Sequence, residues 1–119
     1  MSAAPITTEI ANFISRRRSA SVPADVPADV IDYTRLLTFD AIGTLAAATH
    51  PMVTSSAGIG AFAVTHGGAG TATLIGQATK VDVANAALAN GTCGYAIDME
   101  PHHPEAILHP MAVLVPTAL

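Results

Sequence analysis

The sequence has little charge and few aromatic side chains. Only 12% of its 119 residues are charged and 4% are aromatic, whereas 50% are hydrophobic. This composition is too apolar for a disordered chain. The charged fraction is also well below the roughly 25% of an ordinary soluble domain. We therefore expect the chain to cover much of its surface, against a second subunit or against more of its own chain. A homo-oligomer, such as a homodimer, is our expectation.

Basic side chains are scarce as well. The chain has five Lys and Arg residues, three of them in one run at 16–18, and a formal net charge of −4. Because no basic face is available for phosphate backbones, we expect no nucleic-acid partner. The arginine run is interpreted as a solvated helix end.

Long apolar runs and cysteine pairs are also missing. No stretch reaches 18 consecutive apolar residues and the start of the chain shows no signal-type pattern, so we expect no membrane span. Cys93 is the single cysteine, which excludes an internal disulfide and a Cys-ligated iron–sulfur cluster. We expect Cys93 to be buried and the protein to be cytoplasmic.

At 119 residues the chain is long enough for one small domain. Apolar periodicity and Gly/Pro punctuation predict an all-α fold of several packed helices joined by short turns. The expected helices cover residues 6–15, 28–49, 54–66, 80–91 and 110–119, with a short extended piece at 72–76. The tandem repeat at 22–29 (VPADVPAD) predicts a linker, with Pro27 near the first position of the next helix.

Finer features of these helices are also predicted. The first should have Thr7 or Thr8 as its N-cap, the third should end at Gly67-Gly68, and the fourth should stop at Asn90-Gly91. The second half of helix 28–49 is apolar nearly all round, which predicts burial on every side, with Asp40 satisfied by a neighbouring helix end. Five side chains of the second helix are expected to face inward: Val30, Tyr33, Leu37, Ile42 and Leu45. In the first helix one face carries Ile6, Ile10, Phe13 and Ile14, and the fourth has helical spacing of Val81, Ala84 and Leu88.

Titratable side chains gather in one proline-punctuated segment before the last helix. They are Asp98, Glu100, His102, His103, Glu105 and His109. A carboxylate beside a histidine fixes its tautomer and raises its basicity, and a loop between two buried helices would bring Asp98 and His109 to the mouth of a cleft. Two alternatives remain: a metal ion held by Asp98, His103 and His109, or a merely solvated loop.

Three ordered motifs resemble the MmgE/PrpD family, which includes 2-methylcitrate dehydratase and cis-aconitate decarboxylase. They are the Leu-Leu-x-x-Asp-x-x-Gly run at 36–43, the Ala-x-x-Asn-Gly run at 87–91, and the loop with Asp98, His103 and His109-Pro110. The resemblance covers about residues 8–119. Family members are several times longer and pair a helical domain with a smaller α+β domain. The resemblance thus implies that residues 1–119 are an incomplete N-terminal segment, lacking that second domain.

The family loop also implies roles for individual residues. Asp98 and His109 match its active-site Asp and last His, so we expect them to be catalytic, and His102 and His103 are expected to bind substrate. Glu100, Pro101 and His102 replace an Asp, an Asp and a Thr, and Tyr95 stands where the family often has His. These departures leave the substrate within the family open.

The resemblance implies a lyase (dehydratase, decarboxylase or isomerase) that acts on a small polycarboxylate by acid–base chemistry. It also implies no cofactor and no obligatory metal. The family's active-site lysine lies beyond residue 119, so we expect the isolated segment to be inactive. One alternative to the lyase is a non-catalytic protein, either a truncated remnant or an assembly partner that binds through exposed apolar helices. A further alternative is a small metal-binding module.

Overall fold

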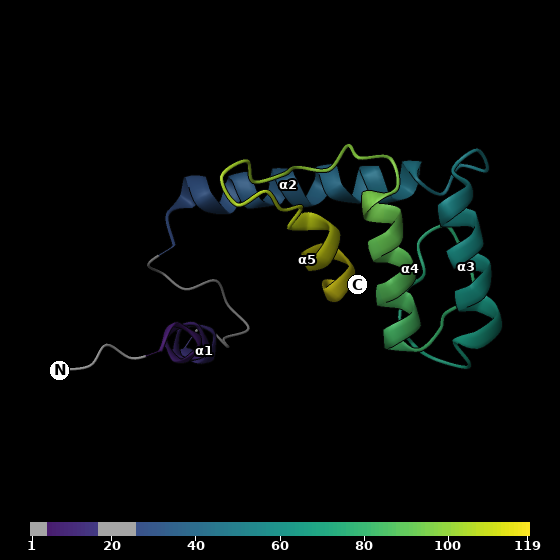
Figure 1. Cartoon of the computed structure of the whole chain (residues 1–119), viewed down its shortest axis with the longest axis horizontal. Helices are drawn as coiled ribbons and strands as arrows, with labels where there is room; N and C mark the ends of the chain where they lie inside the picture. The colour runs from purple at the N-terminus through teal and green to yellow at the C-terminus, as the bar shows by residue number, and fades with distance from the viewer. Residues whose placement is uncertain (1–4, 17–25) are drawn as a thin grey trace. The chain divides into compact units, whose positions relative to one another are not determined.

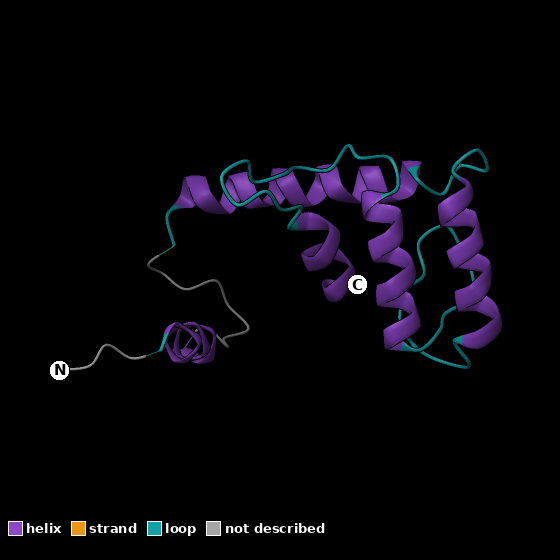
Figure 2. Ribbon diagram, in the orientation of Figure 1, coloured by secondary structure: helices purple, strands orange, loops and turns teal. Residues whose placement is uncertain are grey.

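Helices provide the regular secondary structure of the residues that the computed structural model describes, 5–16 and 26–119. They are α1 (Ile6–Arg16), α2 (Ala28–Ala47), α3 (Thr54–His66), α4 (Val83–Tyr95) and α5 (Met111–Ala118), as Figure 1 shows. Figure 2 shows no strand in the described ranges, where β-pairing is limited to isolated bridges between Ala72 and Val81 and between His103 and Leu108. The prediction of an all-α fold is confirmed.

The chain divides into a first unit that ends at Tyr33 and a second unit, Thr34–Leu119. In the first unit, α1 begins at Ile6, and the Thr8 N–H donates to the Pro5 carbonyl over 2.8 Å. The prediction of Thr7 or Thr8 as N-cap is therefore wrong, because both lie inside the helix. No residue of α1 is buried, so its apolar stripe is exposed. Arg17, Arg18 and residues 22–25 of the predicted linker lie outside the described residues, and Pro27 directly precedes α2, as expected.

Helix α2 is buried along one stripe only. Ala41, Thr44 and Leu45 are buried, and Leu37 is partly buried. The opposite face is open, with Phe39 78% exposed, so the prediction of burial on every side is wrong. The inward positions predicted for Val30, Tyr33 and Ile42 are wrong as well, because all three are exposed. Asp40 is also exposed and remains in reach of water, so it needs no helix end to satisfy it.

The first core cluster joins α2, α4 and α5, which lie close to one another in Figure 1. Its buried members are Ala41, Leu45, Ala48, Cys93, Met111 and Val115. Cys93 is thus buried, as predicted. Gly94 lets α4 and α5 approach closely, because a Cβ at this position would lie 3.2 Å from the Cα of Ala112.

The second core cluster lies between α3, α4 and the segment that connects them. Ala63, Leu74, Val81, Ala86 and Ala89 form it. Helix α3 ends as predicted: the Gly67 N–H donates to the Ala63 carbonyl over 2.8 Å, and Gly68 follows with φ of 57°. The predicted extended piece is present only as the bridge at Ala72.

Helix α4 continues through the predicted stop and ends at Tyr95. The side chain of Asn90, only 1% exposed, accepts from the Ile75 N–H over 3.0 Å and donates to the Thr73 carbonyl over 2.8 Å. Asn90 therefore holds the connecting segment against α4 instead of ending the helix. Ala84 and Leu88 are exposed, while Val81 is buried just before the helix.

Candidate functional site

The candidate site lies in the loop between α4 and α5. The Asp98 N–H donates to the Tyr95 carbonyl over 3.1 Å, and Asp98 itself has φ of 51°, in the left-handed region that Asp tolerates better than most residues. This sharp turn starts the loop directly at the end of α4. His109 stands at its other end, just before Pro110, the N-cap of α5.

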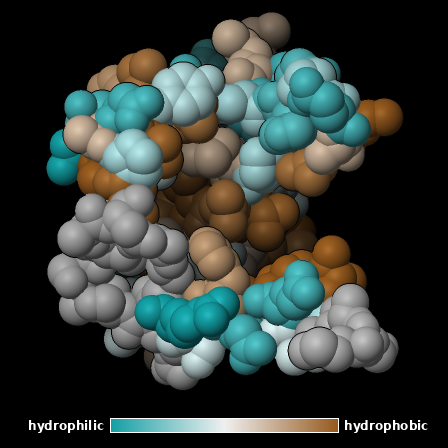
Figure 3. Space-filling model, turned by 90° about the vertical axis from the view of Figure 1, so that its left-hand side faces the viewer, coloured by the Kyte–Doolittle hydropathy of each residue, from teal (hydrophilic) through white to brown (hydrophobic). Residues whose placement is uncertain are grey.

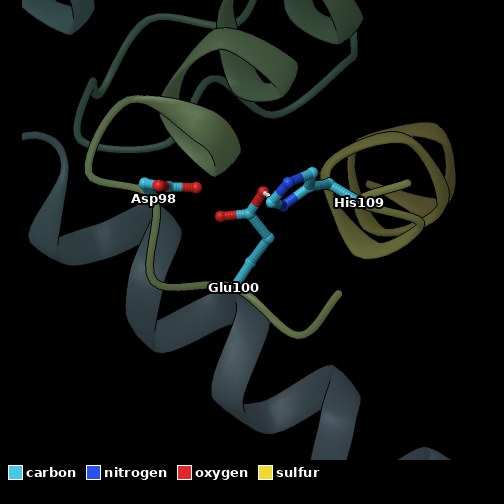
Figure 4. Close-up of side chains that lie close together, drawn as sticks. All are labelled: Asp98, Glu100 and His109. Atoms are coloured by element: carbon cyan, nitrogen blue, oxygen red, sulfur yellow. Dashed lines mark ion pairs between the residues drawn. The ribbon is translucent and has the colours of Figure 1, made fainter. Parts of the chain in front are cut away.

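Three titratable side chains of the loop converge on one point. Asp98, Glu100 and His109 each place one potential ligand atom within 4.8 Å of the others. Figure 4 shows their side chains approaching from different sides, with the imidazole of His109 and the carboxylate of Glu100 facing each other. Asp98 is exposed, His109 is half-buried and Glu100 is buried. The arrangement joins a buried carboxylate, an imidazole and a second, solvated carboxylate.

The contact between Glu100 and His109 is close but poorly oriented. Oε1 of Glu100 lies 2.7 Å from Nδ1 of His109, and the Glu100 side chain is 1% exposed. This is a hydrogen-bond distance, yet both Glu100 oxygens and His109 Nδ1 lack a hydrogen-bond partner of acceptable geometry. The contact is therefore an ion pair when the His109 ring is protonated, without a formed hydrogen bond. A buried carboxylate without hydrogen bonds is unfavourable by several kcal/mol unless a proton or cation neutralises it.

Aromatic rings surround His109. The Tyr95 ring meets it edge-on at a centroid distance of 4.9 Å, and the His102 ring lies tilted at 5.9 Å. Tyr95 and His109 also line a groove of about 540 Å³ between α4 and α5, together with apolar side chains such as Leu88 and Val113. The imidazole thus borders an open, largely apolar groove.

His103 belongs to a different part of the loop. Its N–H donates to the Leu108 carbonyl over 2.9 Å, and its Nδ1 accepts from the Ala106 N–H over 3.2 Å. The same Nδ1 lies 3.3 Å from Oε2 of the exposed Glu105, which is an ion pair only when the ring is protonated, and a protonated Nδ1 cannot accept from Ala106. His103 is not a member of the converging group, so the structure does not bring together Asp98, His103 and His109, the set named in the alternative metal interpretation.

Glu100 takes that third place, and we did not predict it as a site residue. The available signal was its position two residues after Asp98, where the family pattern has a second Asp. Sequence spacing does not reveal burial, and burial is what distinguishes Glu100 from Glu105 in the same loop.

The 36–43 motif contributes to both faces of α2: Leu37 packs against the first core cluster, and Asp40 and Gly43 are exposed. Asp40 and Gly43 line a pocket of about 320 Å³ there, beside Ile97 and Met99 from the start of the loop. Two of the three motifs therefore meet at the loop. The 87–91 motif instead contains Asn90, which holds the segment between α3 and α4, and Gly91, where a Cβ would lie 3.3 Å from the Ala112 carbonyl oxygen on α5.

Comparisons with known proteins agree with these motifs. The family model described as the MmgE/PrpD N-terminal domain matches residues 8–119. Searches of curated proteins and of solved structures found no match. Within the described part of the chain, no helix is both long and apolar enough to cross a membrane. Because the match spans nearly the whole sequence, the chain belongs to the MmgE/PrpD family and corresponds to its N-terminal domain.

Proposed function

We propose that this chain supplies one wall of an acid–base lyase site for a small polycarboxylate. The observation that carries the proposal is the meeting of Asp98, Glu100 and His109 within 4.8 Å at the start of α5. An imidazole beside carboxylates can hold and release a proton near neutral pH, which is what such a reaction requires.

In a dehydration, a base removes a proton from the carbon next to a carboxylate, and the neighbouring hydroxyl leaves as water after it accepts a proton. A carbon–carbon double bond forms in its place. His109 is suited to one of these proton transfers, because its ring borders the groove between α4 and α5. Asp98, which is exposed, would orient the substrate or carry the second proton.

Substrate carboxylates need positive or hydrogen-bonding groups. His102 and His103 are exposed and would serve as donors to them. Residues 96–110 contain no Lys or Arg, so the fixed positive charge for a polycarboxylate has to come from elsewhere. For this reason we propose that the 119-residue segment alone does not turn over substrate.

The test uses the protein expressed from its complete gene and hydroxy-polycarboxylates of the citrate class. Water loss and solvent deuterium incorporation are followed by proton NMR. We expect His109→Ala to lower kcat by about 100- to 10,000-fold, the usual contribution of a general acid or base, with the circular dichroism spectrum unchanged. His66→Ala, on α3, is the matched control and should keep the parent rate. Parent-level turnover by His109→Ala would overturn the proposal.

Exposed apolar side chains favour a second candidate function, that of a non-catalytic assembly partner. Phe39 is 78% exposed, Val113 66% and Leu36 62%, and Figure 3 shows hydrophobic side chains at the surface on the face it views. This candidate expects a homo-oligomer, in the cytoplasm, and no turnover. Size-exclusion chromatography with light scattering tests it, and a monomer at all concentrations would contradict it.

A further inference from the structure

We propose that Asp98, Glu100 and His109 bind one divalent transition-metal ion, for which Zn²⁺ is the representative. This inference goes beyond the proposed lyase function and does not depend on it, because it concerns binding and not turnover. It rests on the geometry of the three side chains, on the burial of Glu100 and on the chemistry of the donor set.

The geometry suits a single ion. Metal–ligand bonds of about 2.0–2.2 Å place neighbouring donor atoms roughly 3–4 Å apart. The three potential ligand atoms already lie within 4.8 Å of one another. Side-chain rotations would have to bring these atoms from their present spacing into that range. In Figure 4 all three side chains point toward the same space.

Glu100 provides an independent reason to expect a cation. Its side chain is 1% exposed, and neither of its oxygens has a hydrogen-bond partner. The group that faces it at short range is Nδ1 of His109, 2.7 Å away, which also lacks a hydrogen-bond partner. A cation bound by both atoms would require them to move apart from 2.7 Å to the donor spacing of a metal site, and it would offset the unfavourable burial of a carboxylate that has no hydrogen bond.

The donor set indicates the class of metal. Ca²⁺ and Mg²⁺ are bound by oxygen ligands, whereas an imidazole suits zinc and its neighbours in the first transition row. Three protein ligands leave a coordination position open, which is the pattern of zinc sites that accept water or a small ligand. Asp98 is exposed, so that position can be reached from solvent.

Isothermal titration of the 119-residue chain with ZnCl₂ tests the inference, with MgCl₂ as the comparison ion. We expect one zinc site per chain and no Mg²⁺ binding at the same concentrations. Glu100→Gln and Asp98→Asn should each weaken zinc binding at least about tenfold, since loss of a ligand costs no less than loss of a supporting contact. Asn tolerates the left-handed backbone at position 98, so the second variant keeps the fold.

Glu105→Gln is the matched control, because Glu105 also lies beside a histidine but is exposed. It should bind zinc like the parent. The inference is overturned if no zinc binds, or if Glu100→Gln and Asp98→Asn bind zinc as tightly as the parent. Circular dichroism checks that each variant is folded. A failure of the lyase assay would leave this binding result unaffected, so the two proposals fail separately.

Discussion

Nδ1 of His109 lies 2.7 Å from Oε1 of Glu100, and the Glu100 side chain is 1% exposed. The two residues come from opposite ends of a loop that starts and ends at packed helices. Their contact therefore brings the beginning and the end of the loop together. It also makes the energetic role of each residue depend on the other, because removing either one leaves a charged or polar group without its neighbour.

A double-mutant cycle measures this dependence. His109→Ala should destabilise the parent by leaving the buried carboxylate alone, and it should destabilise the Glu100→Gln protein less. We expect a coupling energy of about 1–3 kcal/mol, measured by urea denaturation in the presence of EDTA. His102→Ala, which removes an exposed ring, should show coupling close to zero with Glu100→Gln. If the effects of His109→Ala and Glu100→Gln on the unfolding free energy are additive, the contact between the two side chains does not stabilise the fold.

Asn90, in the 87–91 motif, is expected to stabilise the folded protein. Asn90→Ala removes both hydrogen bonds of its buried amide and leaves the Ile75 N–H and the Thr73 carbonyl without that partner. We expect a loss of about 2–4 kcal/mol of unfolding free energy, measured by chemical denaturation. Gln77→Ala, which removes an exposed amide, should change stability by less than about 0.5 kcal/mol. Equal effects of the two substitutions would contradict this role.

Two helical glycines should respond differently to the same substitution. A Cβ at Gly94 would lie 3.2 Å from the Cα of Ala112, whereas a Cβ at Gly58 would meet nothing within 4 Å. Gly94→Val should therefore push α5 away from α4 and destabilise the fold by about 1–3 kcal/mol. Gly58→Val should be nearly neutral, because valine is at least as good a helix former as glycine. Thermal denaturation compares the two, and a larger loss at Gly58 would contradict the packing described for α4 and α5.

Asp82 gives a prediction for pH. Its side chain accepts from Asn85 Nδ2 over 2.7 Å and from the Ala84 and Asn85 N–H groups. These hydrogen bonds lower the pKa of the Asp82 carboxyl below 3.8, and the bond from the Asn85 side chain has the largest effect. Because the folded-state pKa is lowered, the stabilisation is present above the unfolded pKa of about 3.9 and is lost as the pH falls through the folded value.

Asp82→Ala should accordingly lower the Tm at pH 7 by on the order of a few degrees, through loss of the N-cap. The difference from the parent should shrink as the pH falls below about 4. Asp29→Ala, in the first turn of α2, is the control for a generic acidic residue near a helix start. A difference that stays constant from pH 7 to pH 2 would argue against the charged cap.

Local patterns in the sequence determined which segments are helical. Prolines before α2 and α5 and the Gly67-Gly68 pair after α3 bound these helices near their predicted ends. Such signals act within about four residues, through backbone conformation and hydrogen bonding. They can therefore be recognised in the sequence without knowledge of the tertiary structure. The crowding of titratable groups in the loop and the three family motifs were legible for the same reason.

Distant contacts decided the remaining features. Asn90 reads as a helix stop in isolation, yet its amide is held by Thr73 and Ile75, and α4 continues beyond it. The stripe of α2 that is buried follows from where α4 and α5 pack, which no periodicity within α2 can indicate. Glu100 and Glu105 are chemically alike, and only the closing of the loop buries one beside His109 and leaves the other in water. Burial depends on residues far apart in the chain, so the tertiary structure alone selects the carboxylate that faces the imidazole.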